Sequence, residues 1–379
     1  MKTRKLLALL CAFILVFILA ACGGGDGGSD NLSASDETPA GDAGDTGAPA
    51  AEPLKVALLL NGTLGDKAFF DSANNGIAMI NSTLQNVETK VVEATYDDTK
   101  WEPALLDLCD ENHDIIICGT WQMQEIVARI APDYPDKKFI VYDTAMDYSA
   151  GDFSNIYSIE YKQNDGSFLA GVLAASMSET GIIGFVGGMD NTVIYDFLVG
   201  YIQGAQTVNP DIKVQSAFVG DFSNTARAKE LALSQYNMGA DIIFSCASTA
   251  GDGTMQAGKE VGKFIIGVDS DQAMLYKETD GEQAELIPTS VLKRVDMSLF
   301  QSIEKAQQGA LEWGTRVALG IPEDCIGLAD NEVYQEIVPA GTKALVDEYI
   351  EKIKSGEVEV VSAFTMENQE MLDYVNNAK

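Results

Sequence analysis

Two pairs of similar segments decide the fold: DIIICG at residues 114–119 matches DIIFSC at 241–246, and KFIVYD at 138–143 matches KFIIGVD at 263–269. In the first copy, the aspartate that begins DIIICG lies 29 residues before the aspartate that ends KFIVYD, and in the second copy the corresponding separation is 28 residues. Two matches in the same order at nearly equal spacing indicate a duplicated architecture. The chain is therefore predicted to contain two similar halves.

The regions around these segments alternate between short β-branched runs and longer amphipathic stretches. The first half contains KVALLLN at 55–61, a helix from about Phe69, VETKVVEA at 87–94 and a helix from about Glu102. A second series of the same kind starts near Ile156. Strands that alternate with crossover helices form parallel sheets. We therefore predict an α/β protein with two doubly wound parallel-sheet lobes joined by a hinge.

The strand pattern also predicts how the chain divides between the lobes. Residues 54–160 with about 273–327 are expected to form the N-terminal lobe, and residues 161–272 with about 328–379 the C-terminal lobe. The hinge crossings would then fall at the junctions of these segments. Lobes that are joined by several segments commonly close around a ligand by hinge motion.

The first 53 residues have a different character. A basic start is followed by the apolar run at 6–19 and by small residues, which predicts a secretory signal peptide over residues 1–21. LAAC at 19–22 resembles the lipobox of bacterial lipoproteins, in which Cys22 would be diacylated and become the first mature residue. Two acyl chains hold a protein durably at a membrane. Residues 22–53 would then form a disordered tether. The alternative to a cleaved lipoprotein signal is an uncleaved membrane anchor.

Composition and charge argue against several classes of function. The net charge is −32, so nucleic acid and anionic lipid headgroups are poor partners. His113 is the single histidine and no Cys-x-x-Cys pair exists, so we expect no metal site. The sequence also contains neither a nucleophile motif near that histidine nor a phosphate-binding loop. We therefore expect no cofactor, no catalytic residue and no enzyme activity.

Charged side chains lie where several predicted strands end. Asp143 and Asp269 close the matched segments, and ligands of open α/β sheets bind beyond the carboxyl ends of the strands. Lys293 lies where the strand-like part of TSVLKRVD runs into a helix. Facing Asp269, this lysine would complete a donor and acceptor pair suited to a vicinal diol. The alternatives are a helix cap or turn for each aspartate and a surface position for the lysine.

Aromatic side chains lie at the same predicted edge. The loop NGTLGDKAFFDSANNG at 61–76 places Asp66, Phe69 and Phe70 where a strand gives way to a helix. One phenylalanine can anchor the helix in the core, which leaves the other to stack on a flat ligand. Trp121 follows the next apolar strand and could either stack on a ligand or pack beneath a loop. Rings with a diol clamp favour a nucleoside over an amino acid, whose carboxylate usually requires an arginine.

The folded region from about residue 54 to the end resembles the basic membrane protein family, the PnrA-like purine nucleoside-binding lipoproteins of ABC importers. The matching motifs are GDKAFFDSANNG at 65–76, FLAG at 168–171, FVGG at 185–188, IGVDSDQ at 266–272 and SVLKRVD at 290–296. The resemblance implies a type I periplasmic-binding-protein fold. It also implies a base held between aromatic rings and a ribose held by an aspartate and a lysine.

The resemblance assigns roles to single residues. Phe69 matches the stacking phenylalanine, Asp143 resembles the residue that reads the base edge, and Asp269 with Lys293 resembles the ribose pair. Trp121 matches a position that is often aromatic. Two further residues depart from the family, because Ala68 and Phe70 stand where serine and asparagine are usual. This departure leaves room for a changed base preference or another nucleoside-like ligand.

Together, these observations predict an extracytoplasmic, lipid-anchored binding protein on the bacterial cell membrane. It would capture a purine nucleoside as a monomer and deliver it to the permease and ATPase subunits of an ABC importer. The alternatives are a sugar- or autoinducer-binding protein of the same fold and a surface lipoprotein that senses its ligand. A nucleoside-cleaving enzyme is a more remote alternative.

Overall fold

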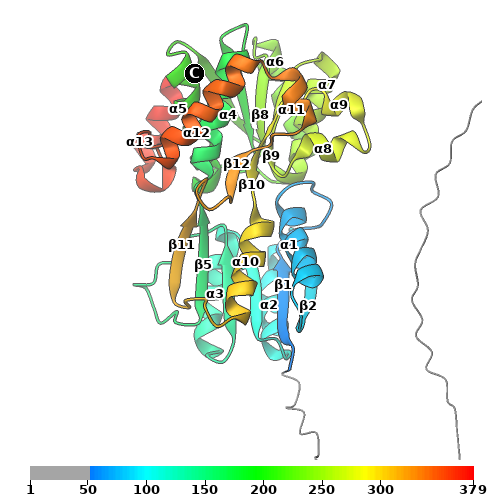
Figure 1. The fold of residues 1–379 in the computed structure, drawn as a ribbon, viewed down its shortest axis with the longest axis vertical. Helices are drawn as coiled ribbons and strands as arrows, with labels where there is room; N and C mark the ends of the chain where they lie inside the picture. The colour runs from blue at the N-terminus through cyan, green and yellow to red at the C-terminus, as the bar shows by residue number, and fades with distance from the viewer. Residues whose placement is uncertain (1–51) are drawn as a thin grey trace, which may run out of the picture. The chain divides into compact units, whose positions relative to one another are not determined.

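The computed structural model describes residues 52–379. The predicted signal peptide, the predicted lipidation site Cys22 and most of the predicted tether therefore lie outside the described residues. Residues 52–379 belong to one unit that contains two lobes, stacked one above the other in Figure 1.

The N-terminal lobe is built on a six-stranded parallel sheet with the order β11-β5-β4-β3-β1-β2. Its strands are β1 (Leu54–Leu60), β2 (Val87–Glu93), β3 (Ile115–Gly119), β4 (Lys138–Tyr142), β5 (Ile156–Tyr161) and β11 (Thr315–Leu319). Its main helices are α1 (Phe69–Thr83), α2 (Trp101–Asp110), α3 (Trp121–Ile130) and α10 (Val295–Gln307). Helices α1 and α10 share one apolar core with the sheet, and α2 and α3 share another on the opposite face. Both faces are covered, which explains why the central strands are continuously apolar.

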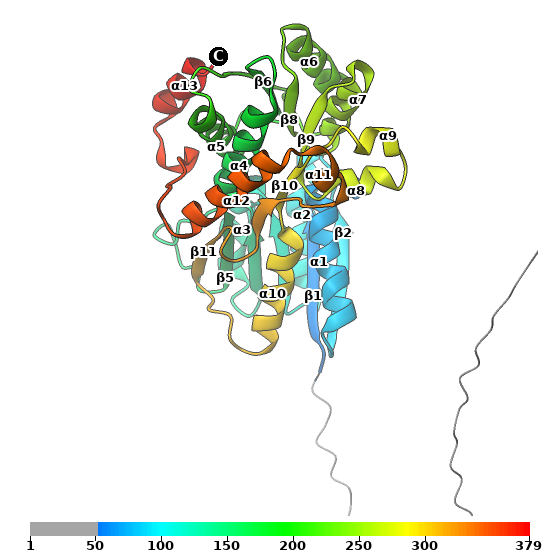
Figure 2. The ribbon, with the colours of Figure 1, turned by 45° about the horizontal axis from the view of Figure 1, so that its top comes forward.

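The C-terminal lobe repeats this plan in a sheet with the order β12-β10-β9-β8-β6-β7. Its strands are β6 (Ile182–Gly187), β7 (Lys213–Phe218), β8 (Ile242–Cys246), β9 (Phe264–Asp269), β10 (Ser290–Lys293) and β12 (Ile326–Leu328). Only the pairing of β12 with β10 is antiparallel among the described strands. Its helices are α4 (Gln163–Met177), α5 (Thr192–Val208), α6 (Thr225–Asn237), α7 (Gly251–Val261), α8 (Gln272–Lys277), α9 (Gly281–Ala284), α11 (Glu332–Ile337), α12 (Ala340–Lys354) and α13 (Asn368–Asn377). Helices α12 and α13 share an apolar core with α4 and α5 (Figure 2).

The two pairs of similar segments occupy equivalent strands in the two lobes. They form β3 and β4 in the first lobe and β8 and β9 in the second. Their opening aspartates also have a common role: Asp114 accepts a hydrogen bond from the backbone of Lys55, and Asp241 accepts from the backbone of Glu179 and Thr180. Each carboxylate thus ties the third strand to the start of the first strand of its lobe. The predicted pair of doubly wound lobes is confirmed.

The chain crosses between the lobes after β5, after β10 and between β11 and β12. The predicted boundary at residue 273 is wrong, because β10 pairs with β9 and the chain leaves the second lobe only after Lys293. The short helices α8 and α9 form a crossover that returns the chain to the same sheet. The third crossing comes before Ile326, earlier than predicted, because β12 adds an antiparallel strand beside β10. No helix in residues 52–379 is long and apolar enough to cross a membrane.

Candidate functional site

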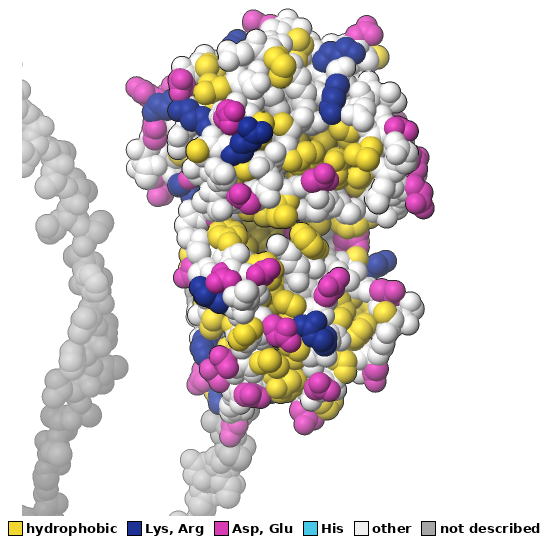
Figure 3. Space-filling view, turned by 180° about the vertical axis from the view of Figure 1, so that it is seen from behind, with side chains coloured by type: hydrophobic (Ala, Val, Ile, Leu, Met, Phe, Trp, Pro, Cys, Tyr) yellow, Lys and Arg dark blue, Asp and Glu magenta, His cyan; other side chains and the backbone are white. Residues whose placement is uncertain are grey.

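A cavity of about 170 Å³ lies between the lobes at the carboxyl ends of their strands. The first lobe lines it with residues that follow β1, β2, β3 and β4, and the second lobe with residues at the ends of β6 through β10. The first turns of α1 and α5 complete the wall. Figure 3 shows apolar side chains gathered along the hollowed waist between the lobes. This is the edge at which open α/β sheets bind ligands.

The strand ends at this cavity are conformationally strained. Thr120, Asp143, Ser248 and Asp269 all line it, and all have positive φ angles of 73°, 61°, 47° and 65°. Non-glycine residues rarely adopt this left-handed region, and such strain gathers at ligand sites. The conformation turns the chain sharply at the end of each strand and holds these side chains at the cavity wall.

A buried ion pair forms one pole of the cavity. The Lys293 Nζ atom, on the second lobe, lies 2.7 Å from Asp143 Oδ1 on the first lobe, and both side chains are buried. The sequence led us to expect that Lys293 faces Asp269 as a donor and acceptor pair for a diol; both residues line the cavity, and the ammonium is hydrogen-bonded to Asp143. The Lys293 ammonium also lies 5.1 Å from the ring centroids of both Phe69 and Phe197.

Asp269 is the unsatisfied member of this pole. Its Oδ1 atom is buried and has no hydrogen-bond partner within residues 52–379. Burial raises the pKa of Asp269 to about 7, against the opposing charge of Lys293 and with a further increase from Asp143. Burial alone would lower the pKa of Lys293, but the charges of Asp143 and Asp269 outweigh it and raise this pKa. The pole therefore combines a charged ammonium with a carboxylate that can accept hydrogen bonds from a ligand.

Aromatic rings form the wall next to this pole. Phe69 stacks on Tyr142 with a centroid distance of 5.4 Å, and Phe70 meets Phe69 edge-on at 5.3 Å. The sequence suggested that one phenylalanine could anchor the helix while the other stacks on a ligand, whereas in the structure both belong to the apolar core and both line the cavity. Gly62 allows this arrangement, because a Cβ atom at that position would lie 2.1 Å from the ring of Phe70.

The first lobe also supplies an amide side chain, that of Asn61, to the cavity wall. Asn61 is buried directly after β1, where its Nδ2 atom donates to Thr120 Oγ1 at 2.9 Å and to Gln122 Oε1 at 3.3 Å. Its Oδ1 atom is buried without a partner in residues 52–379. Asn61 follows β1 and Asp143 follows β4, which are two strand spacings, or about 10 Å, apart in the sheet. The cavity thus has a charged pole and an amide pole.

The second lobe offers a hydrogen-bond donor to the cavity. Asn191 caps helix α5, because its Oδ1 atom accepts from the backbone N–H of Ile194 at 3.1 Å. This bond fixes the orientation of the amide, and its buried Nδ2 atom has no partner among the described residues. Sequence reasoning missed both Asn61 and Asn191. Asn61 directly follows the first strand of its lobe, and Asn191 directly precedes a helix. These positions could have identified both residues as candidates for the site.

Two predicted site residues have distinctive positions. Trp121 lines the cavity at its outer lip and is 39% exposed. Asp66 does not line the cavity. Instead, its carboxylate accepts hydrogen bonds from the backbone of Ala68, Phe70 and Asp71 and so caps helix α1. Asp66 therefore positions the two phenylalanines, and the sequence-based expectation that it contacts the ligand does not match its place in the structure.

Residues 52–379 contain no group of three or more side chains that could hold a metal ion. His113 precedes β3 and contacts Glu111, so it lies at the amino ends of the strands, away from the cavity.

A sequence model described as "ABC transporter substrate-binding protein PnrA-like" matches residues 54–360. This match spans both lobes and every strand. The chain belongs to the PnrA-like family of ABC transporter substrate-binding proteins.

Relatives of this PnrA-like protein are known from several bacteria. Basic membrane protein A of Borreliella burgdorferi is 29% identical over 80% of this chain and 89% of its own length. The ABC transporter nucleoside-binding protein BmpA of Lactococcus lactis subsp. cremoris is 31% identical over 60% of this chain and 66% of its own length. A solute-binding protein of an ABC transporter system from Aeropyrum pernix K1 has a similar fold, with a TM-score of 0.73 and 23% identity over 86% of this chain and 99% of its own.

Family membership settles the general function. PnrA-like proteins are solute-binding components of ABC transporters and not enzymes, and they bind a small molecule for delivery to the transporter. The family works at the extracytoplasmic side of the membrane, as the membrane-protein names of the relatives indicate.

Proposed function

We propose that this PnrA-like protein binds a purine nucleoside between its lobes and delivers it to an ABC importer. The observation that carries the proposal is the cavity with two poles about 10 Å apart, one charged and one amide, joined by aromatic walls. A nucleoside has the same layout, because it carries a hydroxyl-bearing sugar at one end and a flat base with hydrogen-bonding edges at the other.

The charged pole suits a ribose. The Asp269 Oδ1 atom, which has no partner within residues 52–379, can accept a hydrogen bond from a ribose hydroxyl, and the Lys293 ammonium can donate to the same diol. Because Asp143 holds Lys293 in place, its contribution would be to orient the lysine as much as to touch the ligand.

The aromatic walls and the amide pole suit a base. Phe69 and Phe70 from the first lobe and Phe197 from the second can enclose a flat ring, and stacking of this kind contributes about 1–3 kcal/mol per base. Asn61 Oδ1 would accept from an N–H group on the base edge, and Asn191 Nδ2 would donate to a ring nitrogen or carbonyl.

The charge of the lining favours a nucleoside over a nucleotide. Within residues 52–379, Asp143, Asp221 and Asp269 line the cavity with Lys293 as the single cation. A phosphate or carboxylate group would meet net negative charge there. The name of the Lactococcus relative, a nucleoside-binding protein, supports the same ligand class.

The N-terminal residues supply the location. We infer that Cys22 carries the lipid anchor and that residues 23–53 tether the two lobes to the extracytoplasmic face of the cell membrane. The tethered lobes can then present the bound nucleoside to the permease and ATPase subunits.

Calorimetric titration tests the proposal. Protein that starts at Gly23, stripped of carried-over ligand by unfolding and refolding, is titrated with adenosine, inosine, guanosine, cytidine and ribose. We expect saturable binding of purine nucleosides that is lost in Asp269→Asn and in Lys293→Met. Folded protein that binds none of the nucleosides, or that binds ribose as tightly as adenosine, would overturn it and bring the sugar-binding alternative forward.

A further inference from the structure

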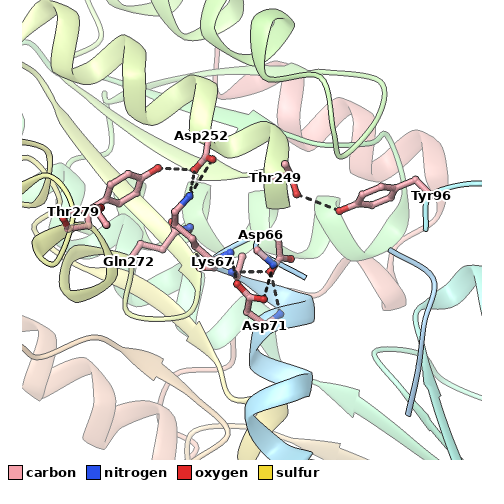
Figure 4. Close-up of polar contacts among 11 residues, drawn as sticks. Asp66, Lys67, Asp71, Tyr96, Thr249, Asp252, Gln272 and Thr279 are labelled. Carbon is pink, nitrogen blue, oxygen red and sulfur yellow. Dashed lines mark hydrogen bonds and ion pairs between the residues drawn. The ribbon is translucent and has the colours of Figure 1, made fainter. Parts of the chain in front are cut away.

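Three consecutive residues of the loop between β1 and α1 reach across the cleft to the second lobe. Figure 4 shows two of them, Asp66 and Lys67. Asp66 Oδ2 accepts a hydrogen bond from Ser248 Oγ at 3.0 Å. The carbonyl oxygen of Lys67 accepts from Gln272 Nε2 at 3.4 Å, and that of Ala68 accepts from Ser270 Oγ at 3.2 Å.

The side chain of Lys67 makes the charged contact of this group. Its Nζ atom lies 3.2 Å from Asp252 Oδ2, at the start of helix α7. The same ammonium lies 5.4 Å from the ring centroid of Tyr276, whose hydroxyl donates to Asp252 Oδ1 at 2.5 Å. Lys67, Asp252 and Tyr276, which we call the cleft latch, thus join the two lobes in one polar cluster.

The half of the latch on the first lobe is built independently of the second lobe. Asp71, on helix α1, accepts from the backbone N–H groups of Gly65 and Lys67, each at 2.8 Å. Lys67 itself has a positive φ of 52°, a conformation that these bonds hold in place. Since these bonds lie within one lobe, opening of the hinge leaves them intact. Lys67 is therefore presented in the same position before and after closure.

The latch stands outside the cavity. Neither Lys67 nor Asp252 lines it, and Tyr276 does not line it either. Lys67 and Asp252 are about one-third exposed, at 34% and 29% of their side-chain areas. An ion pair of this exposure contributes only a modest free energy. Because this pair joins the two lobes, the whole of that free energy stabilises the closed state.

We propose that Lys67 is a positioning residue that holds the lobes closed and thereby sets how long a ligand stays bound. This inference rests on the proposed binding function. Because the latch does not touch the ligand, it stabilises the closed state for every ligand alike. It therefore changes the rate of release and leaves the ratio of affinities between ligands unchanged.

The test compares ligand release and lobe opening in matched variants. In Lys67→Met, we expect the dissociation rates of adenosine and inosine to rise by the same factor, about two- to fivefold. Lys67→Glu should raise them further through repulsion of Asp252, and adding Asp252→Lys should return them to within about twofold of the parent. The control is Lys259→Met, which breaks an ion pair of similar exposure with Asp280 inside the second lobe.

Lobe opening is measured separately by fluorescence energy transfer between dyes at Ser82→Cys on the first lobe and Met238→Cys on the second. The four native cysteines of the described residues are buried, so the two new thiols are the ones expected to react. We expect the open population to increase in Lys67→Met, without any nucleoside added, and to remain unchanged in Lys259→Met.

The two readouts separate the latch from the choice of ligand. If no nucleoside binds, the proposed function fails, and the distance distributions alone decide the latch. Unchanged opening in Lys67→Met and in Lys67→Glu would overturn the latch even if nucleosides bind. Changed affinity ratios between adenosine and inosine would also overturn it, because they would place Lys67 at the ligand.

Discussion

Replacing Asp269 by asparagine is expected to stabilise the protein against unfolding while it replaces the ionisable carboxylate of the binding site by a neutral amide. Asp269 is buried, its Oδ1 atom has no partner within residues 52–379, and burial raises its pKa to about 7. In the unfolded chain, an aspartate ionises at its ordinary pKa of about 4. The folded protein therefore disfavours ionisation between these two values. The contribution of Asp269 to stability is present below pH 4 and is lost as the pH rises through about 7.

The size of this effect follows from the difference in pKa. About three pKa units correspond to about 4 kcal/mol above pH 8, which is an upper limit. Asparagine abolishes the ionisation, but its own amide needs hydrogen bonds in the same place. We therefore expect Asp269→Asn to raise the free energy of unfolding by about 2 kcal/mol at pH 8 and to change it little at pH 4.

Urea unfolding of ligand-stripped protein at pH 4, 6 and 8 measures this gain. Burial also raises the pKa of Asp196 to about 7 and that of Asp165 to about 6, so some decline with pH should remain in the variant. Asp221→Asn is the matched control in the same cavity. Backbone hydrogen bonds from Ser223 and Asn224 outweigh burial and lower the pKa of Asp221, so its replacement should destabilise at pH 8. An Asp269→Asn variant no more stable than the parent at pH 8 would refute the reasoning.

Three further changes probe the rest of the account. Gly62→Ala places a Cβ atom 2.1 Å from the Phe70 ring. It should therefore weaken purine nucleoside binding at least about tenfold and lower the free energy of unfolding by about 1–3 kcal/mol. Full affinity in calorimetric titration would contradict this prediction. Asn61→Leu removes the amide pole, so adenosine affinity should fall about tenfold in calorimetric titration, and an unchanged affinity would exclude a base at this position. Cys22→Ala should abolish the incorporation of radiolabelled palmitate into the protein, and a variant labelled as strongly as the parent would argue against the lipid anchor.

The sequence predicted the fold well because the duplicated segments form the central strands of each sheet. Those strands are buried on both faces, so their apolar runs stand out and their order follows from the crossover rule. The boundary at residue 273 failed for a local reason. Strand β10 has only the four residues Ser290–Lys293, and its connection uses two short helices, so the pattern resembled a linker rather than a return to the same sheet.

The sequence predicted several of the residues that line the site, but it did not predict which charged side chains pair with each other. Phe69, Phe70 and Trp121 line the cavity with Asp143, Asp269 and Lys293. Each of them ends a strand, directly follows one or lies in the first turn of a helix, which the sequence reveals.

The partner of Lys293 depends on how the two lobes meet. The sequence of one lobe cannot show that Asp143, which belongs to the opposite lobe, lies nearer to Lys293 than Asp269 does. Asp66 was misassigned for a similar reason, because a helix-capping carboxylate and a ligand-binding carboxylate look alike in a loop.

The most direct test of the central claim is a crystal structure of the protein with adenosine bound. We predict the ribose hydroxyls within hydrogen-bond distance of Asp269 Oδ1 and Lys293 Nζ, the base between Phe69 and Phe197, and the base edge at the Asn61 amide. Adenosine bound in the opposite direction, with its base at Asp269, or bound outside the cavity would contradict the two-pole account.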